Sequence, residues 1–333
     1  MNQEWSRYRE QLQGPGLPRQ AECVLSSLDD TGLIRVTGED ARDFLQGQLT
    51  NDINRVTSSQ GQISAYCTPK GRMLAIFIIF QQGEALYLQL PRERLEPVLK
   101  RLRMFVLRSK VVLEDASDEL VISGFSGSCF SELAAELPEQ PFATLTQEGA
   151  TLIRFPGMPE RFQLVSTAEK SITAWEAQRD HAQPVDADYW PLLDIRAGLP
   201  RIYDATAEAF VPQMCNLDLL DGISFSKGCY TGQEVVARMK YLGQLKRRMY
   251  IAQIETETCP LPGEALFSPS SKSAQGAGKV VDSRPSPDGT GCEALVVAEI
   301  AAFEAGDLRL RDANGPALSL REPPYGLSPE ETK

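Results

Sequence analysis

The succession of strand and helix signals in residues 31–115 restricts the fold more than any other feature of this chain. A short apolar run at 32–36 is followed by apolar residues at helical spacing within 38–49. Strand-like runs come next, at 62–67 and 72–80 around a Pro-Lys-Gly turn and at 85–90, before a helical pattern over 92–107 and a β-branched run at 111–113. We interpret this succession as the β-α-β-β-α-β order of a split βαβ unit, which predicts an α+β fold.

Residues 119–190 repeat this rhythm, and the repetition predicts an internal duplication. The pattern has a strand at 120–122, a helix at 129–137, a hairpin from 151–155 and 161–165, and a helix at 167–178. A short helix at 190–197 and a polar connection follow. From residue 245 the chain changes to short strand-like runs between turn-rich loops, which predicts a small antiparallel β-barrel or sandwich. We therefore expect a domain at 1–244 with lobes at 1–116 and 117–244, an end domain at 245–327 and a tail at 328–333.

The octapeptide KGCYTGQE at residues 227–234 holds the strongest candidate for chemistry. Thr231 and Glu234 have the spacing of a capping box, so a helix is predicted to begin here. Cys229 would then lie just outside a helix N-terminus with Lys227 nearby, and both features lower the pKa of a thiol. These residues predict a nucleophile, a soft-metal ligand or a redox group. The alternative is a small buried side chain, a common environment for cysteine.

This octapeptide resembles the signature of the YgfZ family, folate-binding relatives of the glycine-cleavage T-protein that serve iron–sulfur enzymes and, through them, tRNA modification. The segments FLQGQLTND at 44–52, NLD at 216–218 and GISF at 222–225 agree with the resemblance. It implies a duplicated, ferredoxin-like folate-binding domain of the T-protein kind, followed by an antiparallel β-barrel. The implied ligand is tetrahydrofolate or another reduced folate.

The overall charge restricts the partners of this chain. A net charge of −11 and a pI near 4.9 argue against direct binding of nucleic acid or anionic lipid, because those partners require a basic surface. The first residues lack the apolar core of a signal peptide, and no later stretch is apolar enough to span a bilayer. We expect a cytoplasmic monomer whose partners are folate and iron–sulfur client enzymes or assembly factors.

The seven cysteines predict neither a disulfide framework nor an intrinsic metal site, since they are odd in number, widely spaced and without a C-x-x-C pair. The single histidine, His181, excludes His-based triads. Only Cys229 and Cys67 have plausible site positions, and the other five are expected to fill core or surface. Two thiols suffice to share a labile cluster with ligands from another protein but not to hold one alone.

The resemblance also implies a set of site residues. Cys229 and Lys227 form the functional motif, in which Lys227 supports the thiolate or a folate glutamate unless it is a solvated surface residue. The implied folate-binding residues are Asn51, Lys70, Arg196, Asn216, Asp218, Tyr230, Gln233 and Glu234. Each has a structural alternative. This is a C-cap turn for Asn51, Asn216 and Asp218, and a solvated hairpin tip for Lys70. It is packing beneath the loop for Tyr230, and a helix cap for Gln233 and Glu234. For Arg196 that alternative is an ion pair with Asp194 or Asp204.

One departure from the T-protein pattern bears on activity. T-proteins have a catalytic aspartate just after the glycine of the turn at 69–71, where this chain has Leu74 and Ala75. Neither side chain accepts a proton or orients an amine. We therefore expect a folate-binding accessory protein for assembly or repair of iron–sulfur clusters rather than an enzyme. The alternative is a folate-dependent one-carbon transferase, similar to an aminomethyltransferase, that uses Cys229.

Overall fold

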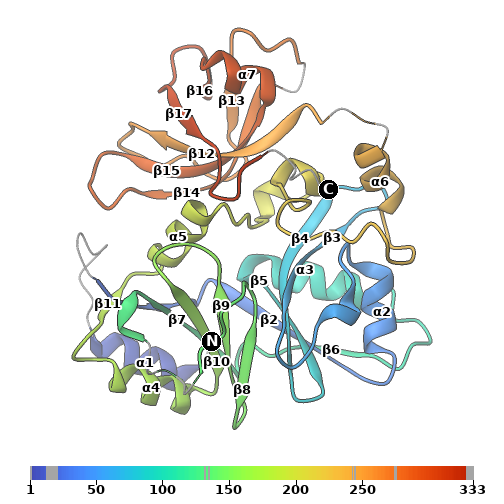
Figure 1. The fold of residues 1–333 in the computed structure, drawn as a ribbon, viewed down its shortest axis with the longest axis vertical. Helices are drawn as coiled ribbons and strands as arrows, with labels where there is room; N and C mark the ends of the chain where they lie inside the picture. Colours follow the sequence, from blue (N-terminus) through green and yellow to red (C-terminus); the bar gives the residue numbers. More distant parts are fainter. Residues whose placement is uncertain are drawn as a thin grey trace.

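The computed structural model describes residues 2–12, 22–130, 133, 136–241, 243, 245–273 and 276–327. Three sheets organise these residues, as Figure 1 shows. Two of them, in blue to cyan and in green, lie side by side in the lower part of the view. The third, in orange and red, forms the upper part. The chain between residues 189 and 241 runs among all three, so it contacts every part of the fold.

The first sheet has five strands in the order β3-β4-β5-β2-β6, all antiparallel to their neighbours. Its elements in chain order are β2 (Thr31–Thr37), α2 (Ala41–Gln48), the 3-10 turn η1 (Ile53–Arg55), β3 (Gln62–Cys67), β4 (Met73–Gln82), β5 (Ala85–Pro91), α3 (Arg92–Arg103) and β6 (Val112–Asp115). Helices and strands therefore occur where the apolar periodicity predicts them.

The connections in this sheet differ from two nested split βαβ units. β5, α3 and β6 form one such unit, because β5 and β6 are parallel and enclose β2. β2 and β3 are antiparallel instead, with β4 and β5 between them. The predicted runs at 62–67, 72–80 and 85–90 all form strands, joined as hairpins by short turns, so the segment has one strand more than the β-α-β-β-α-β order assigned to it.

The second sheet has the order β11-β1-β7-β10-β9-β8. Its strands are β1 (Val24–Ser27), β7 (Val121–Ser126), β8 (Thr144–Gln147), β9 (Ala150–Phe155), β10 (Arg161–Ser166) and β11 (Gln183–Val185), with helix α4 (Ala168–Ala177) before β11. β9 and β10 form the predicted hairpin. Within the helix expected at 129–137, Ser128–Phe130 is a 3-10 turn (η2), and 131–132 and 134–135 lie outside the described residues.

The N-terminal segment belongs to this second sheet, which the sequence did not indicate. β1 pairs with β7 on one side and β11 on the other. A helix, α1 (Gln3–Leu12), buries Trp5 against Trp175 of α4, with ring centroids 5.0 Å apart. The Trp5 indole N–H also donates to the Ser27 hydroxyl at 3.0 Å. The start of the chain is thus anchored to the second half rather than to the first.

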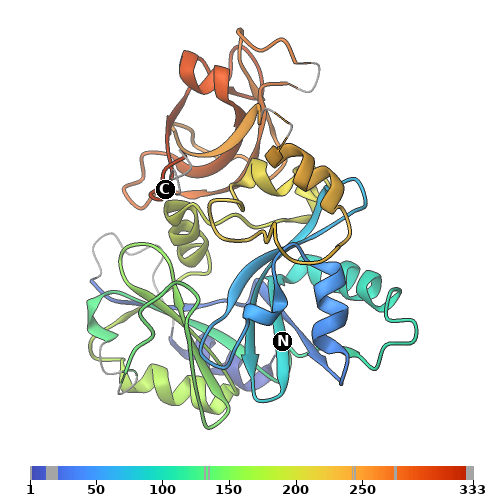
Figure 2. The same ribbon diagram turned by 45° about the vertical axis from the view of Figure 1, so that its right-hand side comes forward.

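The remaining elements form the return segment and the end domain. They are α5 (Tyr189–Ala197), η3 (Asp204–Thr206), η4 (Pro212–Cys215), α6 (Gln233–Tyr241), β12 (Arg247–Ile254), β13 (Ala265–Phe267), β14 (Gly278–Pro285), β15 (Cys292–Glu299), α7 (Ile300–Ala305), β16 (Arg309–Leu310) and β17 (Leu318–Arg321). The last sheet has the order β16-β13-β14-β15-β12-β17 and curls as a half-barrel, seen edge-on in Figure 2.

Both faces of the first sheet are buried, which explains its nearly continuous apolar strands. Along β4, Ile76 and Phe80 belong to the core between the halves, whereas Phe77 and Ile79 belong to the core with residues of α2 and α3. A further core lies within the end domain. The space between the two halves is therefore walled by a rigid, buried sheet.

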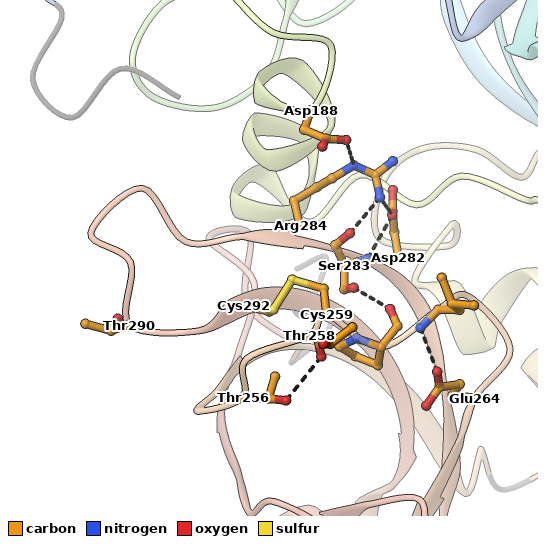
Figure 3. The surroundings of a disulfide bond; sticks show 12 residues. Asp188, Thr256, Thr258, Cys259, Glu264, Asp282, Ser283, Arg284, Thr290 and Cys292 are labelled. Carbon is orange, nitrogen blue, oxygen red and sulfur yellow. Dashed lines mark hydrogen bonds and ion pairs between the residues drawn. A yellow bond between two sulfur atoms is a disulfide. The ribbon is translucent and has the colours of Figure 1, made fainter. Parts of the chain in front are cut away.

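The cysteines contradict the prediction of no disulfides. Cys23 is bonded to Cys129, and Cys259 to Cys292 (Figure 3). The two cysteines of the first bond are 106 residues apart in sequence, and those of the second are 33 residues apart. Sheet pairing, which spacing does not report, brings β1 beside β7 and thereby makes the first pair possible. Beside the second pair, the Ser283 hydroxyl donates to the Pro260 carbonyl at 2.5 Å.

Candidate functional site

Cys229 lies on an exposed loop that leads into α6. The predicted helix is present, but it begins at Gln233, four residues after the thiol. Gly232, with φ of +87°, precedes it, and the Glu234 side chain pairs forward with Arg238 at 3.4 Å. The expected reciprocal cap between Thr231 and Glu234 is therefore replaced by a glycine turn. The tightness of this turn explains the glycine, because a Cβ on Gly232 would lie 2.5 Å from the Thr68 carbonyl oxygen.

Lys227 is the anchor of this loop. Its Nζ donates to the carbonyl oxygens of Gln46, Leu49 and Asn51 at 2.7, 2.8 and 2.9 Å. An ammonium has three N–H donors, so these contacts use all of them. The ammonium also lies 5.2 Å from the ring centroid of the buried Tyr230. Burial lowers the pKa of Lys227 to about 8. Lys227 therefore positions the loop, and its charge is directed at the carbonyl end of α2 rather than at Cys229.

The loop is bonded to the segment 44–52 at further points, so two of the sequence motifs form one structural unit. The Ser224 amide donates to the Thr50 carbonyl at 3.0 Å, and the Thr50 hydroxyl donates to the Gly222 carbonyl at 2.7 Å. The side chain of Asn51 is fully buried and donates to the carbonyls of Asp221 and Ile63 at 2.6 and 3.0 Å. Asn51 thus joins the return segment to β3.

Of the cysteines outside disulfides, only Cys229 is exposed. Burial raises the pKa of the Cys67 thiol to about 12 and that of Cys215 higher still. Cys67 is also fully buried, so ligands from another protein do not reach its thiol in this conformation, and the structure does not support a cluster shared between Cys67 and Cys229. Lys70 lies exposed on the adjacent turn. Among the described residues, no group of three or more Cys, His, Asp or Glu side chains is arranged to hold a metal ion.

Two cavities lie between the halves, and Ile63 lines both. The larger, of about 350 Å³, is lined from β3, the loop before β8, the 219–221 turn and Tyr325. Gln62 lines it, is only 7% exposed, and neither its amide oxygen nor its amide nitrogen has a partner among the described residues. The smaller is lined by Gln89, whose amide oxygen is also buried without a partner. Unpaired buried amides of this kind indicate space for a polar ligand or ordered water.

Asp194 lies at the wall of the smaller cavity and balances two buried arginines. Arg161 contacts one carboxylate oxygen at 2.7 Å, and Arg201 contacts the other at 2.8 Å. Arg201 also donates to Asp30 at 3.0 Å. Burial lowers the pKa of Arg161, while Asp194 opposes that change. The cluster fixes α5 against β10 and leaves this carboxylate with both of its oxygens in use.

Comparison with known proteins identifies the relatives of this chain. No family model matches it. It is 36% identical over 321 residues to the tRNA-modifying protein YgfZ of Yersinia pestis (strain Pestoides F), covering 95% of both chains. The YgfZ of Yersinia enterocolitica is 36% identical over 313 residues, covering 92% of this chain and 94% of the relative. The chain belongs to the YgfZ family.

The fold of this YgfZ family member is shared with a solved structure of low sequence identity. The glycine cleavage system aminomethyltransferase T from Bartonella henselae superposes with a TM-score of 0.72, at 14% identity, over 98% of both chains. The chain therefore has a mixed α/β fold of the T-protein kind. None of the helices in the part of the chain that the structure describes has the length and apolar content of a membrane span.

In this member of the YgfZ family, the side chains of three implied folate-binding residues are paired with residues of the end domain. Arg196 pairs with Glu293 of β15 at 2.5 Å, not with Asp194 or Asp204. Asp218 forms a bidentate pair with Arg248 at 2.6 and 2.9 Å. Asn216, with φ of +58°, donates to the Met249 carbonyl at 2.9 Å. These contacts join the return segment to β12 and β15, so the three side chains hold the return segment against the end domain.

The sequence reasoning missed Gln62, Gln89 and Asp194. The sequence pattern could have indicated the two glutamines as site residues. Each is the lone long polar side chain in an apolar strand, Gln62 in QISAYC (β3) and Gln89 in ALYLQLP (β5). A buried polar position in such a strand needs a partner. From the sequence, Asp194 is expected only as a possible ion-pair partner of Arg196. Its role follows from Arg161, which lies 33 residues away in β10.

Proposed function

We propose that this protein binds a reduced folate in the cavity lined by Gln62 and supports iron–sulfur enzymes through Cys229. The observation that carries the proposal is the buried, unpartnered amide of Gln62 in a cavity of about 350 Å³ between the halves. Small-molecule sites are concave, largely apolar and supplied with a few convergent polar groups. The T-protein fold and the family membership support the choice of ligand.

The residues of the cavity fit the polar edge of a pterin. That edge carries both donors and acceptors, and a glutamine amide offers one of each. Ile63 and Phe142 supply apolar surface for the ring, while Arg55, beside Asp221, supplies positive charge at the rim. A bound folate supplies one-carbon or reducing chemistry. The protein contributes orientation of the ring and exclusion of water.

The folate assignment is tested by replacing Gln62 with leucine. Removing a buried amide that lacks a partner leaves the free protein as stable as the wild type or more stable, whereas the affinity for tetrahydrofolate falls at least tenfold. Calorimetry and the rise in melting temperature with added tetrahydrofolate measure the two effects. Gln163→Leu is the matched control, because that glutamine is equally buried and unpartnered but lines neither cavity. Equal affinity in both variants would contradict the assignment.

Cys229 is the group that we assign to the client reaction. It is the exposed free thiol, and one such thiol does not hold a cluster alone. The relatives are tRNA-modifying proteins by name, and we infer that this activity depends on iron–sulfur client enzymes. We expect Cys229→Ser to keep the fold and the folate affinity, while client activity in cells lacking the native protein stays at the level without any copy. Full recovery of client activity by Cys229→Ser would refute the assignment.

A one-carbon transfer of the aminomethyltransferase kind has little support in the site. Leu74 and Ala75 are buried in β4, and the Leu74 carbonyl accepts from the Arg94 guanidinium at 3.0 Å. This position therefore offers no acid or base. An assay with aminomethylated carrier protein and tetrahydrofolate tests the alternative, and turnover comparable to that of a T-protein would favour it over the accessory role.

The finer architecture is also a proposal. We infer that the halves predicted at 1–116 and 117–244 are copies of one unit once the N-terminal segment with α1 and β1 is assigned to the second half. An end domain at 245–327, which closes as a barrel, follows them. The strand orders support the duplication: β3-β4-β5-β2-β6 matches β8-β9-β10-β7-β11 once β1 is removed from the second sheet. A bridge between Arg309 and Ala317, beside the two edge strands of the last sheet, supports closure.

A further inference from the structure

An apolar surface with fixed backbone geometry follows α3. Met104, Leu107 and Val112 expose 68%, 88% and 52% of their surface, and Phe105 is also exposed. We call these four residues the α3–β6 patch. Its backbone is ordered by hydrogen bonds, since the Ser109 amide donates to the Val106 carbonyl at 2.8 Å. Leu107 has a φ of +44°, in the left-handed region that is unfavourable for residues other than glycine. The fold therefore holds a large apolar side chain in solvent at an energetic cost.

Positive charge surrounds this patch. Residues 97–113 contain five lysines and arginines and no carboxylate, although the whole chain has a net charge of −11. Lys110 pairs with Glu39 at 2.6 Å, and Arg103 donates to the Leu113 carbonyl at 3.0 Å. Lys100 and Arg108 are exposed, with no hydrogen-bond or ion-pair partner among the described residues. An apolar centre with free cations at its rim is the composition of a protein interface.

The patch and the Cys229 loop lie at opposite ends of the same helix. At the start of α2, the Lys110 amide donates to the Asp40 carboxylate at 2.7 Å. At its end, Lys227 binds the carbonyls of Gln46 and Leu49. An eight-residue helix spans about 12 Å at about 1.5 Å per residue. The segment that carries the patch and the loop that carries Cys229 are therefore held at the two ends of one short helix. In Figures 1 and 2, α2 and α3 lie together in the first half of the molecule.

We propose that the α3–β6 patch is a docking surface for a protein with an acidic rim around an apolar surface, whose reactive group then meets Cys229. Charge complementarity selects an acidic partner, because the free cations are Lys100 and Arg108. The exposed methionine and leucine favour a protein over RNA, which is bound by stacking and phosphate contacts. An extended polyanion or an anionic bilayer would meet the net negative charge of the rest of the chain. The assignment is independent of the folate proposal.

The partner class is tested by photo-crosslinking in growing cells. A photoreactive amino acid replaces Leu107 in the full chain, and Leu261, which is 69% exposed in the end domain, is the matched control position. We expect a discrete protein adduct from position 107 that is absent from position 261. Mass spectrometry then identifies the protein, which we expect to have an acidic surface. Adducts with RNA or lipid alone, no adduct at 107, or equal adducts at both positions would overturn the proposal.

The identified protein then serves as the probe for affinity with purified full-length chains. Lys100→Glu with Arg108→Glu should weaken binding at least tenfold, whereas Lys246→Glu with Lys272→Glu, which changes the net charge equally in the end domain, should weaken it less than twofold. Met104→Ser with Leu107→Ser should also weaken binding at least tenfold. Met158→Ser with Leu261→Ser, outside the patch, should weaken it less than twofold. Binding that is unchanged by the patch variants refutes the docking surface. Tetrahydrofolate affinity stays at the wild-type value in all four variants, so failure of this proposal is distinct from failure of the folate site.

Discussion

Two buried charge sites hold the return segment against the halves, and they are built in opposite ways. Lys227 places an ammonium among carbonyl dipoles at the end of α2. Asp194 places a carboxylate between Arg161 and Arg201, and Asp30 supplies a second carboxylate to Arg201, so the formal charges balance one another. The difference decides how each site responds to substitution and to pH. Removing one member of a balanced cluster leaves an unpaired buried charge, whereas removing a charge bound by dipoles leaves carbonyls that water can reach.

The largest effect on stability is expected for Asp194→Ala. It leaves the buried Arg161 guanidinium without a carboxylate and Arg201 with Asp30 alone, which lowers the free energy of unfolding by about 3–5 kcal/mol. Urea denaturation measures the change. Asp221→Asn removes the charge of an exposed pair with Arg55 and tolerates the φ of +53° at this position, so it is the control and should cost less than about 1 kcal/mol. Similar losses in the two variants would contradict the balanced-cluster interpretation.

A smaller effect is expected for Lys227→Met, which keeps the aliphatic stem and removes the three hydrogen bonds. We expect a loss of about 1–3 kcal/mol and faster proteolysis between residues 222 and 232, because the loop loses its contact with α2. Lys70→Met, at an exposed turn, should stay within about 0.5 kcal/mol of the wild type. If Lys227→Met leaves both stability and proteolysis unchanged, Lys227 does not position the loop.

The smallest effect concerns pH. The pKa of Lys227 is lowered to about 8 in the folded protein, against about 10.4 in an unfolded chain. Between these values the unfolded chain binds more protons, so the contribution of this group to stability rises as pH rises. The stability of the wild type relative to Lys227→Met should therefore increase from pH 7 to pH 10. A constant or falling difference would show that the hydrogen bonds to the carbonyls offset the cost of burying the ammonium, so that its pKa is not lowered on folding.

The sequence by itself determined the local elements and the motif. Apolar periodicity located the strands and helices between residues 31 and 115, and β7, β9, β10, α4 and α5 of the second half, but not α1, β1, β8 or β11. The octapeptide located the loop that carries the exposed Cys229. Gly232, in the same octapeptide, adopts the positive φ of the turn before α6. These features depend on residues near one another in the chain, and for that reason a linear pattern reports them.

Only the tertiary structure decided which groups meet. The acceptors of Lys227 are 176 to 181 residues away, and the partner of Arg196 is 97 residues away. Two disulfides join cysteines whose spacing suggested none. Gln62 became a candidate ligand contact only because the packing of the two halves left its amide unpaired. Hydrogen bonds and buried ion pairs form only between groups that lie close together in space. Their partners are therefore fixed by the packing of distant segments and not by the order of residues along the chain.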